Sequence, residues 1–106
     1  MTALKLRKWD SAEHLKTEED MALYLDACLQ EAGDDAAFIV KALGIIARTK
    51  GMSQLSRETG LGRESLYKAL SGDGNPSFAT ILKVTNALGI KLHAQSMHSA
   101  GRASLL

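Results

Sequence analysis

The sequence is poor in the features that mark secreted scaffolds and membrane proteins. Cys28 is the only cysteine among 106 residues, so the chain cannot form an internal disulfide. No stretch approaches the run of about 18 apolar residues that a membrane-spanning helix requires. The charged N-terminus is not followed by an apolar run, so a signal peptide is not expected. These absences predict a cytoplasmic protein with no membrane contact.

Aromatic residues and proline are also scarce. The chain has one Trp, two Tyr and two Phe, and Pro76 is its only proline. A core must therefore be built mainly from Leu, Ala and Ile, which suits packed helices better than a sheet. The apolar share of 45% and the charged share of 24% match folded globular proteins. The sequence thus predicts an all-α fold, with residues 1–95 forming a single helical domain.

Capping residues and glycines divide this region into five predicted helices. Thr17–Asp20 has the form of a capping box for the first helix, and Asp34-Asp35 precedes the second. Two short helices over 52–59 and 63–70 follow, and Ser77 caps the last. The expected buried stripes are Met21, Tyr24, Leu25, Cys28, Leu29 and Ala32 on the first helix, Phe38, Ile39, Ala42, Leu43 and Ile46 on the second, and Phe78, Ile81, Leu82, Thr85 and Leu88 on the last.

Both ends of the chain contain short stretches that alternate apolar and polar residues. Ile90–Gln95 suits one short strand, and Leu4–Arg7 alternates similarly. A short strand pair between the two ends is therefore a further expectation. The final residues, 96–106, are mostly Ser, Gly and Ala, and a flexible C-terminal tail is predicted there.

Charge is unevenly distributed along the chain, although the net charge is only +1. Residues 1–40 carry four basic and nine acidic residues, whereas residues 41–70 carry six basic and two acidic ones. Residues 71–106 carry three basic residues and one acidic residue. An acidic front and a basic middle indicate two surfaces with different partners, unless the clustering merely reflects solvated helix faces.

Residues 52–70 match the helix-turn-helix pattern, in which two short helices are joined by a short turn that contains glycine. Gly60 permits a sharp exit from the first helix, and Leu61 supplies an apolar residue for the turn. Leu66 and Leu70 are four residues apart and bury the inner face of the second helix. Plain helical bundles also contain such helix pairs, so spacing alone leaves a bundle without DNA binding open.

The outward face of the second short helix carries side chains that suit the DNA major groove. Arg and Lys donate to guanine, Glu accepts from cytosine, and Ser and Tyr reach bases or phosphates. The starts of the neighbouring helices are suited to phosphate contact. The predicted base-contacting residues are Arg63, Glu64, Ser65, Tyr67 and Lys68, and the predicted phosphate-contacting residues are Ser53, Gln54, Asn75 and Ser77.

Residues 51–80 read GMSQLSRETGLGRESLYKALSGDGNPSFAT. This segment resembles the HigA-like addiction module antidote proteins, which belong to the Xre/Cro class, and the resemblance extends over about residues 5–95. Its most specific parts are Leu66–Leu70, Gly74–Pro76 and Phe78–Gly89. The resemblance implies a five-helix, lambda-repressor-like DNA-binding domain, often homodimeric. It also implies an antitoxin that neutralises a small RelE/ParE-type toxin and represses its own operon by binding double-stranded operator DNA.

One position departs from the family pattern. Gly62 stands where such sequences usually carry Ser or Thr as the N-cap of the recognition helix. Glycine costs only a few tenths of a kcal/mol at that position, so the helix is retained. The departure removes one hydroxyl suited to a phosphate contact.

The resemblance also suggests a purpose for the acidic front of the chain. Toxins of this type act on RNA and are expected to be basic, so acidic side chains would steer their association. For any single acid, a solvated helix face is the alternative interpretation. The predicted toxin-facing residues are Glu13, Glu18, Glu19, Asp20, Asp26 and Glu31.

No residue pattern indicates catalysis. The sequence lacks GxGxxG, P-loop and paired-carboxylate motifs, and its three histidines lack partners at metal-ligand spacing. No enzyme activity, cofactor or metal site is therefore expected. Three functions remain: a DNA-binding antitoxin, a stand-alone Xre-family transcriptional regulator, and a protein-interaction module that does not bind DNA. Trp9 either plugs the end of the core or lies at a subunit contact, for which the terminal strand and the last helix are the other candidates.

Overall fold

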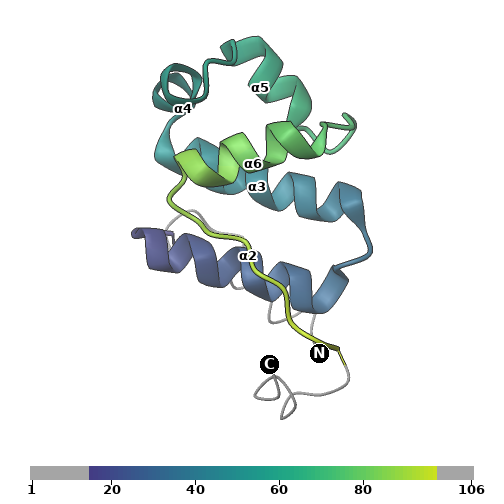
Figure 1. Cartoon of the computed structure of the whole chain (residues 1–106). Helices are drawn as coiled ribbons and strands as arrows, with labels where there is room; N and C mark the ends of the chain where they lie inside the picture. Colours follow the sequence, from purple (N-terminus) through teal and green to yellow (C-terminus); the bar gives the residue numbers. More distant parts are fainter. Residues whose placement is uncertain (1–14, 98–106) are drawn as a thin grey trace.

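The computed structural model describes residues 15–97, which contain five α-helices and no strand (Figure 1). The all-α, five-helix prediction is confirmed for this range, and each helix begins at the predicted position. Helices α2 and α3 are long, whereas α4 and α5 are about two turns each. The bounds are Glu18–Ala32 for α2, Ala36–Lys50 for α3, Met52–Thr59 for α4, Arg63–Ala69 for α5 and Phe78–Ala87 for α6.

Side-chain caps fix the starts of three helices. The Thr17 hydroxyl accepts a hydrogen bond from the backbone N–H of Asp20 at 3.0 Å, and the Asp20 carboxylate accepts one from the Thr17 N–H at 3.2 Å. This pair is the predicted capping box. Asp35 and Ser77 accept hydrogen bonds from backbone N–H groups three residues further along, at the starts of α3 and α6. Each cap satisfies an N–H group that the helix itself leaves without a partner.

The core is built around α3. This helix packs against α2 on one side and against α4 on the other, while α4 also contacts α5 and α6 (Figure 1). Leucine, isoleucine and valine fill the space between them, as the shortage of aromatic residues predicts. The fully buried side chains are Leu15, Cys28, Leu43, Ile46, Leu55, Leu66, Val84, Thr85 and Leu88.

Three residues expected in the core are instead exposed. Leu29 is 40% exposed, Phe78 67% and Leu82 38%. Leu29 lies at the edge of the apolar stripe of α2, and Phe78 and Leu82 lie at the edge of the stripe of α6. The buried face of α6 is centred on Val84, Thr85 and Leu88, and Phe78 and Leu82 lie outside it. The sequence-based assignment of these three residues to the core was wrong.

The predicted strand at Ile90–Gln95 is also not formed. This segment has no strand conformation, although it follows α6 directly and passes across α2 (Figure 1). Ile90 is buried and Leu92 packs partly against the core. The apolar and polar residues alternate because one side of this segment packs on helices and the other faces solvent. The proposed partner strand, Leu4–Arg7, lies outside the described residues, as do Trp9 and the predicted tail from 98 onward.

Candidate nucleic-acid interface

Helices α4 and α5 are joined by a three-residue turn, Gly60–Gly62, whose shape is fixed by local hydrogen bonds. Gly60 has a φ of 79°, a left-handed conformation that favours glycine, and its N–H donates to the Ser56 carbonyl at 2.9 Å. The Ser56 hydroxyl donates to the Leu61 carbonyl at 2.6 Å. The Leu61 N–H in turn donates to the Thr59 hydroxyl at 3.2 Å. These contacts hold the two helices at one relative orientation.

The hydroxyl groups of Ser56 and Thr59 stabilise this turn through hydrogen bonds, and the sequence analysis did not identify them. Both lie in the last turn of α4, where the Thr59 hydroxyl also donates to the Leu55 carbonyl at 2.7 Å. Hydroxyl residues that precede a glycine turn often bond to nearby backbone in this way. Two hydroxyl residues just before a glycine turn are therefore a sequence signal that could have identified these contacts.

Helix α5 has a buried face and a polar exposed face. Leu66 and Leu70 are buried, as predicted from their spacing. The five predicted base-contacting residues all lie exposed on this one short helix, which stands at the end of the molecule opposite α2 (Figure 1). Within the described range the only ion pair joins Lys50 to Glu18, so the cationic groups of Arg63 and Lys68 have no carboxylate partner there.

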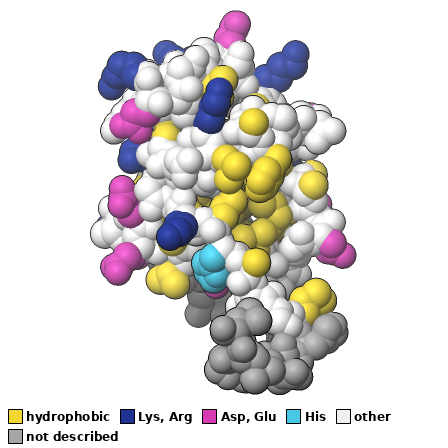
Figure 2. Space-filling model, viewed as in Figure 1, with side chains coloured by type: hydrophobic (Ala, Val, Ile, Leu, Met, Phe, Trp, Pro, Cys, Tyr) yellow, Lys and Arg dark blue, Asp and Glu magenta, His cyan; other side chains and the backbone are white. Residues whose placement is uncertain are grey.

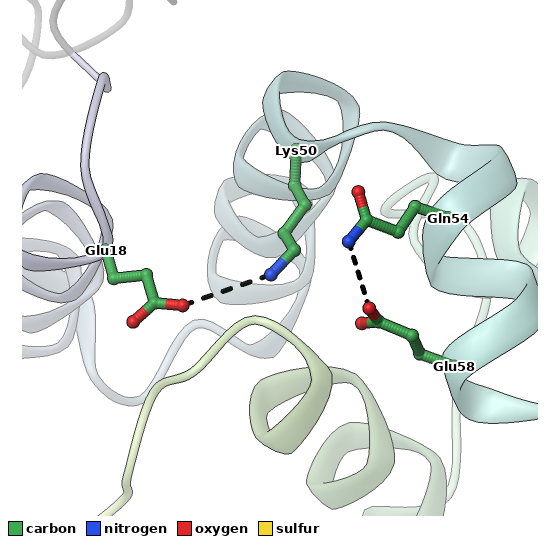
Figure 3. Close-up of polar contacts among 4 residues, drawn as sticks. All are labelled: Glu18, Lys50, Gln54 and Glu58. Carbon is green, nitrogen blue, oxygen red and sulfur yellow. Dashed lines mark hydrogen bonds and ion pairs between the residues drawn. The ribbon is translucent and has the colours of Figure 1, made fainter.

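The predicted phosphate-contacting residues occupy the starts of α4 and α6, but two of them already make internal hydrogen bonds. The Gln54 side-chain amide donates to the Glu58 carboxylate at 2.9 Å (Figure 3). The Ser77 hydroxyl caps α6 and lies 3.2 Å from the Thr80 hydroxyl. Ser53 and Asn75 are exposed and make no such contacts in the described structure. The Gln54 amide has a second N–H, which is not used by its hydrogen bond to Glu58.

Gly62 is the N-cap of α5, in an extended conformation with a φ of −65° and a ψ of 153°. No side-chain hydrogen bond caps this helix. A Cβ built on Gly62 would meet no atom within 4 Å. The position is therefore open to a larger side chain, and nothing in the fold requires glycine there.

The predicted toxin-facing acids separate into distinct groups. Glu18 lies 4.0 Å from the Lys50 ammonium (Figure 3), and Asp20 is occupied by the capping box of α2. Glu19, Asp26 and Glu31 are exposed on α2 and make no hydrogen bond or ion pair with other described residues. The last of the predicted acids is Glu13, which lies outside the described residues.

The part of the chain seen in the structure contains no group of three His, Cys, Asp or Glu side chains arranged to hold a metal ion. Across residues 15–97, no helix is both long and apolar enough to cross a membrane. His93 is exposed, and the other two histidines lie outside this range.

Comparison with known proteins assigns the chain to a family. A family model described as probable addiction module antidote protein matches residues 5–96. The chain belongs to this antidote family. An uncharacterized protein of Haemophilus influenzae (strain Rd) is 50% identical to this antidote over 96 residues, which is 91% of this chain and 97% of that protein. No solved structure matches the antidote significantly.

Membership of this family confirms the predicted antidote character in general terms. Addiction module antidotes are regulatory proteins without enzyme activity, in agreement with the lack of catalytic motifs. An antidote also implies a toxin as its partner.

Proposed function

We propose that this antidote is a cytoplasmic, DNA-binding antitoxin that neutralises a small basic toxin of the RelE/ParE type and represses its own operon. In this proposal α4 and α5 form an Xre/Cro-type helix-turn-helix. Helix α5 enters the major groove of operator DNA, and a homodimer places two such helices in successive grooves about one helical turn apart.

The exposed face of α5 is the observation that carries the DNA-binding proposal. Leu66 and Leu70 bury one side of the helix, and Arg63 and Lys68 lie exposed without an acidic partner among the described residues. Residues 41–70 as a whole carry six basic residues against two acidic ones. Basic groups that have no internal partner are available to guanine edges and phosphates, which supply specificity and affinity respectively.

The exposed apolar residues of α6 support the homodimer. Phe78 and Leu82 are four residues apart and therefore neighbours on the same helix face. Residues 75–82 contain no charged side chain. A two-fold contact places a surface against its own copy, so a neutral apolar face avoids the repulsion that a charged face would cause. A contact here lies a few residues beyond α5 and would set the spacing of the two recognition helices.

The antitoxin activity is supported by the family and by the acidic α2. The family description favours a toxin partner over a stand-alone regulator. Helix α2 carries five acidic and no basic residues, which suits a basic partner. One observation favours an interaction module without DNA binding: Gly62 supplies no hydroxyl at the N-cap of α5.

The DNA-binding proposal is tested by gel shift with the DNA upstream of the antidote's own reading frame. Arg63→Ala and Lys68→Ala should each weaken binding by about 1–3 kcal/mol, because each removes a base contact. Lys16→Ala is the matched control: it removes one exposed basic group remote from α5 and should leave affinity nearly unchanged. Equal affinity for all four proteins would contradict the site. Wild-type binding that does not weaken with added salt would contradict DNA recognition itself.

The toxin proposal is tested by the reading frame next to that of the antidote. We expect it to encode a basic protein of about 100 residues, the size of a small single domain. Co-expression should yield a stable complex, and the adjacent protein alone should arrest growth. A neighbouring protein that is harmless alone and does not co-purify with the antidote would favour a stand-alone regulator.

A further inference from the structure

A groove of about 280 Å³ lies between α2 and the segment that follows α6. Leu25 and Leu29 of α2 and Ile90 and Leu92 of the other wall line it. Leu23, on the α2 side, is 58% exposed. Figure 2 shows hydrophobic side chains exposed on the viewed face in the region between α6 and α2. Exposed leucines clustered beside a groove are typical of a protein contact surface rather than of free surface.

The charge of α2 indicates what kind of partner fits this groove. Asp26 lines the groove, and Glu19 lies about two turns earlier on the same helix face, one turn before Leu23. Neither carboxylate has an ion-pair partner among the described residues. The opposite wall contributes two basic side chains, Lys91 and His93. The rim on the α2 side is therefore acidic around an apolar floor.

A two-fold contact between copies of the chain does not suit this surface. Such a contact would bring the acidic rim of one α2 close to the same rim of its partner, and like charges in close contact are unfavourable. The α6 face described above is neutral and has no such penalty. The two exposed apolar surfaces thus differ in the partner that their charges allow.

We infer that the groove receives an amphipathic, basic helix of the toxin. Apolar side chains of that helix enter the groove between Leu23, Leu29 and Leu92, and its Lys or Arg side chains face Glu19 and Asp26. This is the helix-in-groove mode of recognition. The inference rests on the proposed antitoxin function and names the surface that performs it.

The groove is separate from the DNA-reading face. Helices α2 and α5 stand at opposite ends of the molecule, with α3 between them (Figure 1). A toxin helix bound at α2 therefore leaves Arg63 and Lys68 accessible. The arrangement predicts a ternary complex in which antidote, toxin and operator DNA bind at the same time.

The experiment uses the full antidote and, as the probe, the protein encoded by the adjacent reading frame, with affinity measured by calorimetry. Asp26→Lys reverses a charge in the groove, and Leu23→Ser removes an exposed apolar contact. Each should weaken binding about tenfold or more, as expected for central interface residues. The matched control is Asp34→Lys, the same charge change at an exposed acid in the turn after α2, eight residues beyond Asp26 and not among the residues that line the groove. It should stay within about twofold of wild type, in line with a non-interface charge.

The possible outcomes separate the groove from the proposed function. Circular dichroism of each variant shows whether the fold is retained. Tight wild-type binding that neither groove variant weakens would overturn the groove and leave the antitoxin function intact. Absence of wild-type binding, or of any such reading frame, would overturn both. Sedimentation of the antidote alone gives one further outcome. If Leu23→Ser shifts the antidote toward monomer, a second copy of the chain occupies the groove, and this also overturns the inference.

Discussion

Gly44, in the middle of α3, lies directly against the backbone of Leu70, the C-cap residue of α5. A Cβ built on Gly44 would be 2.6 Å from the Leu70 carbonyl oxygen, closer than real Cβ contacts allow. Gly44 is buried, and its α3 neighbour Leu43 is a fully buried core residue. The absence of a side chain therefore lets the end of the proposed recognition helix rest on the central helix of the core.

Gly44→Ala is predicted to lower both stability and DNA affinity. Alanine is favoured over glycine inside a helix by about 1 kcal/mol. Forcing a methyl group into a packed site costs about 1–3 kcal/mol, and here the close atom belongs to backbone, which cannot rotate away. We expect a net loss of about 1–2 kcal/mol in the free energy of unfolding, measured by urea denaturation. We also expect a weaker gel shift, because α5 is displaced. Unchanged stability would mean that displacing α5 costs no more than alanine gains in helix propensity, about 1 kcal/mol.

Gly62→Ser is predicted to have the opposite effect. The space around Gly62 is open, and its backbone conformation is available to any residue. Serine at an N-cap accepts a hydrogen bond from the first turn of the helix and should stabilise the fold by a few tenths of a kcal/mol. The hydroxyl should also strengthen operator binding in a gel shift. Gly62→Ala, which adds bulk without a hydroxyl, is the control; equal affinities of the two variants would show that no hydroxyl contact is made.

Glu58→Gln is predicted to strengthen DNA binding at low salt. The Glu58 carboxylate accepts a hydrogen bond from Gln54, a predicted phosphate-contacting residue (Figure 3). It also carries negative charge on α4, the helix that precedes α5 and contacts it. Neutralising it should improve affinity by about 0.5–1 kcal/mol, the scale of an exposed charge interaction, and less as salt is raised. Filter binding across a salt series measures this. Glu31→Gln, an exposed position on α2 at the other end of the molecule, serves as the control for loss of one acid. An equal gain in both variants would mean that only net charge matters.

The helix bounds were predictable because the signals for them are local. Thr17, Asp35 and Ser77 cap helices through side chains that reach only three residues along the chain. The exposure of the predicted base-contacting residues also follows locally, since burying Leu66 and Leu70 turns the remaining side chains of α5 outward. Such features need no knowledge of the rest of the fold.

The errors arose where the answer depends on distant segments. Phe78 lies at the edge of its apolar stripe, and its burial depends on whether a distant segment covers the start of α6. A strand at Ile90–Gln95 requires a partner that alternation cannot reveal. The close approach of Gly44 to Leu70 joins two helices across the core. The Gln54–Glu58 contact differs from these, because its spacing of four residues is a local signal that the sequence analysis overlooked.

Replacing Phe78 and Leu82 together by Ser is predicted to convert a dimeric antidote to a monomer. Phe78 is 67% exposed and Leu82 38%, so the covered part of Leu82 should cost the monomer about 1–2 kcal/mol in the free energy of unfolding. Sedimentation velocity over a concentration series measures the oligomeric state. Leu23→Ser, on the separate α2 surface, is the matched control and should remain dimeric.

Loss of the dimer should also change how DNA binding depends on salt. The slope of log affinity against log salt concentration is proportional to the number of phosphates contacted, so a monomer should show about half the slope of the dimer. Affinity for the protein encoded by the adjacent reading frame should be retained, because its proposed groove lies on α2. A double variant that still sediments as a dimer with an unchanged salt slope would place the subunit contact elsewhere than on α6.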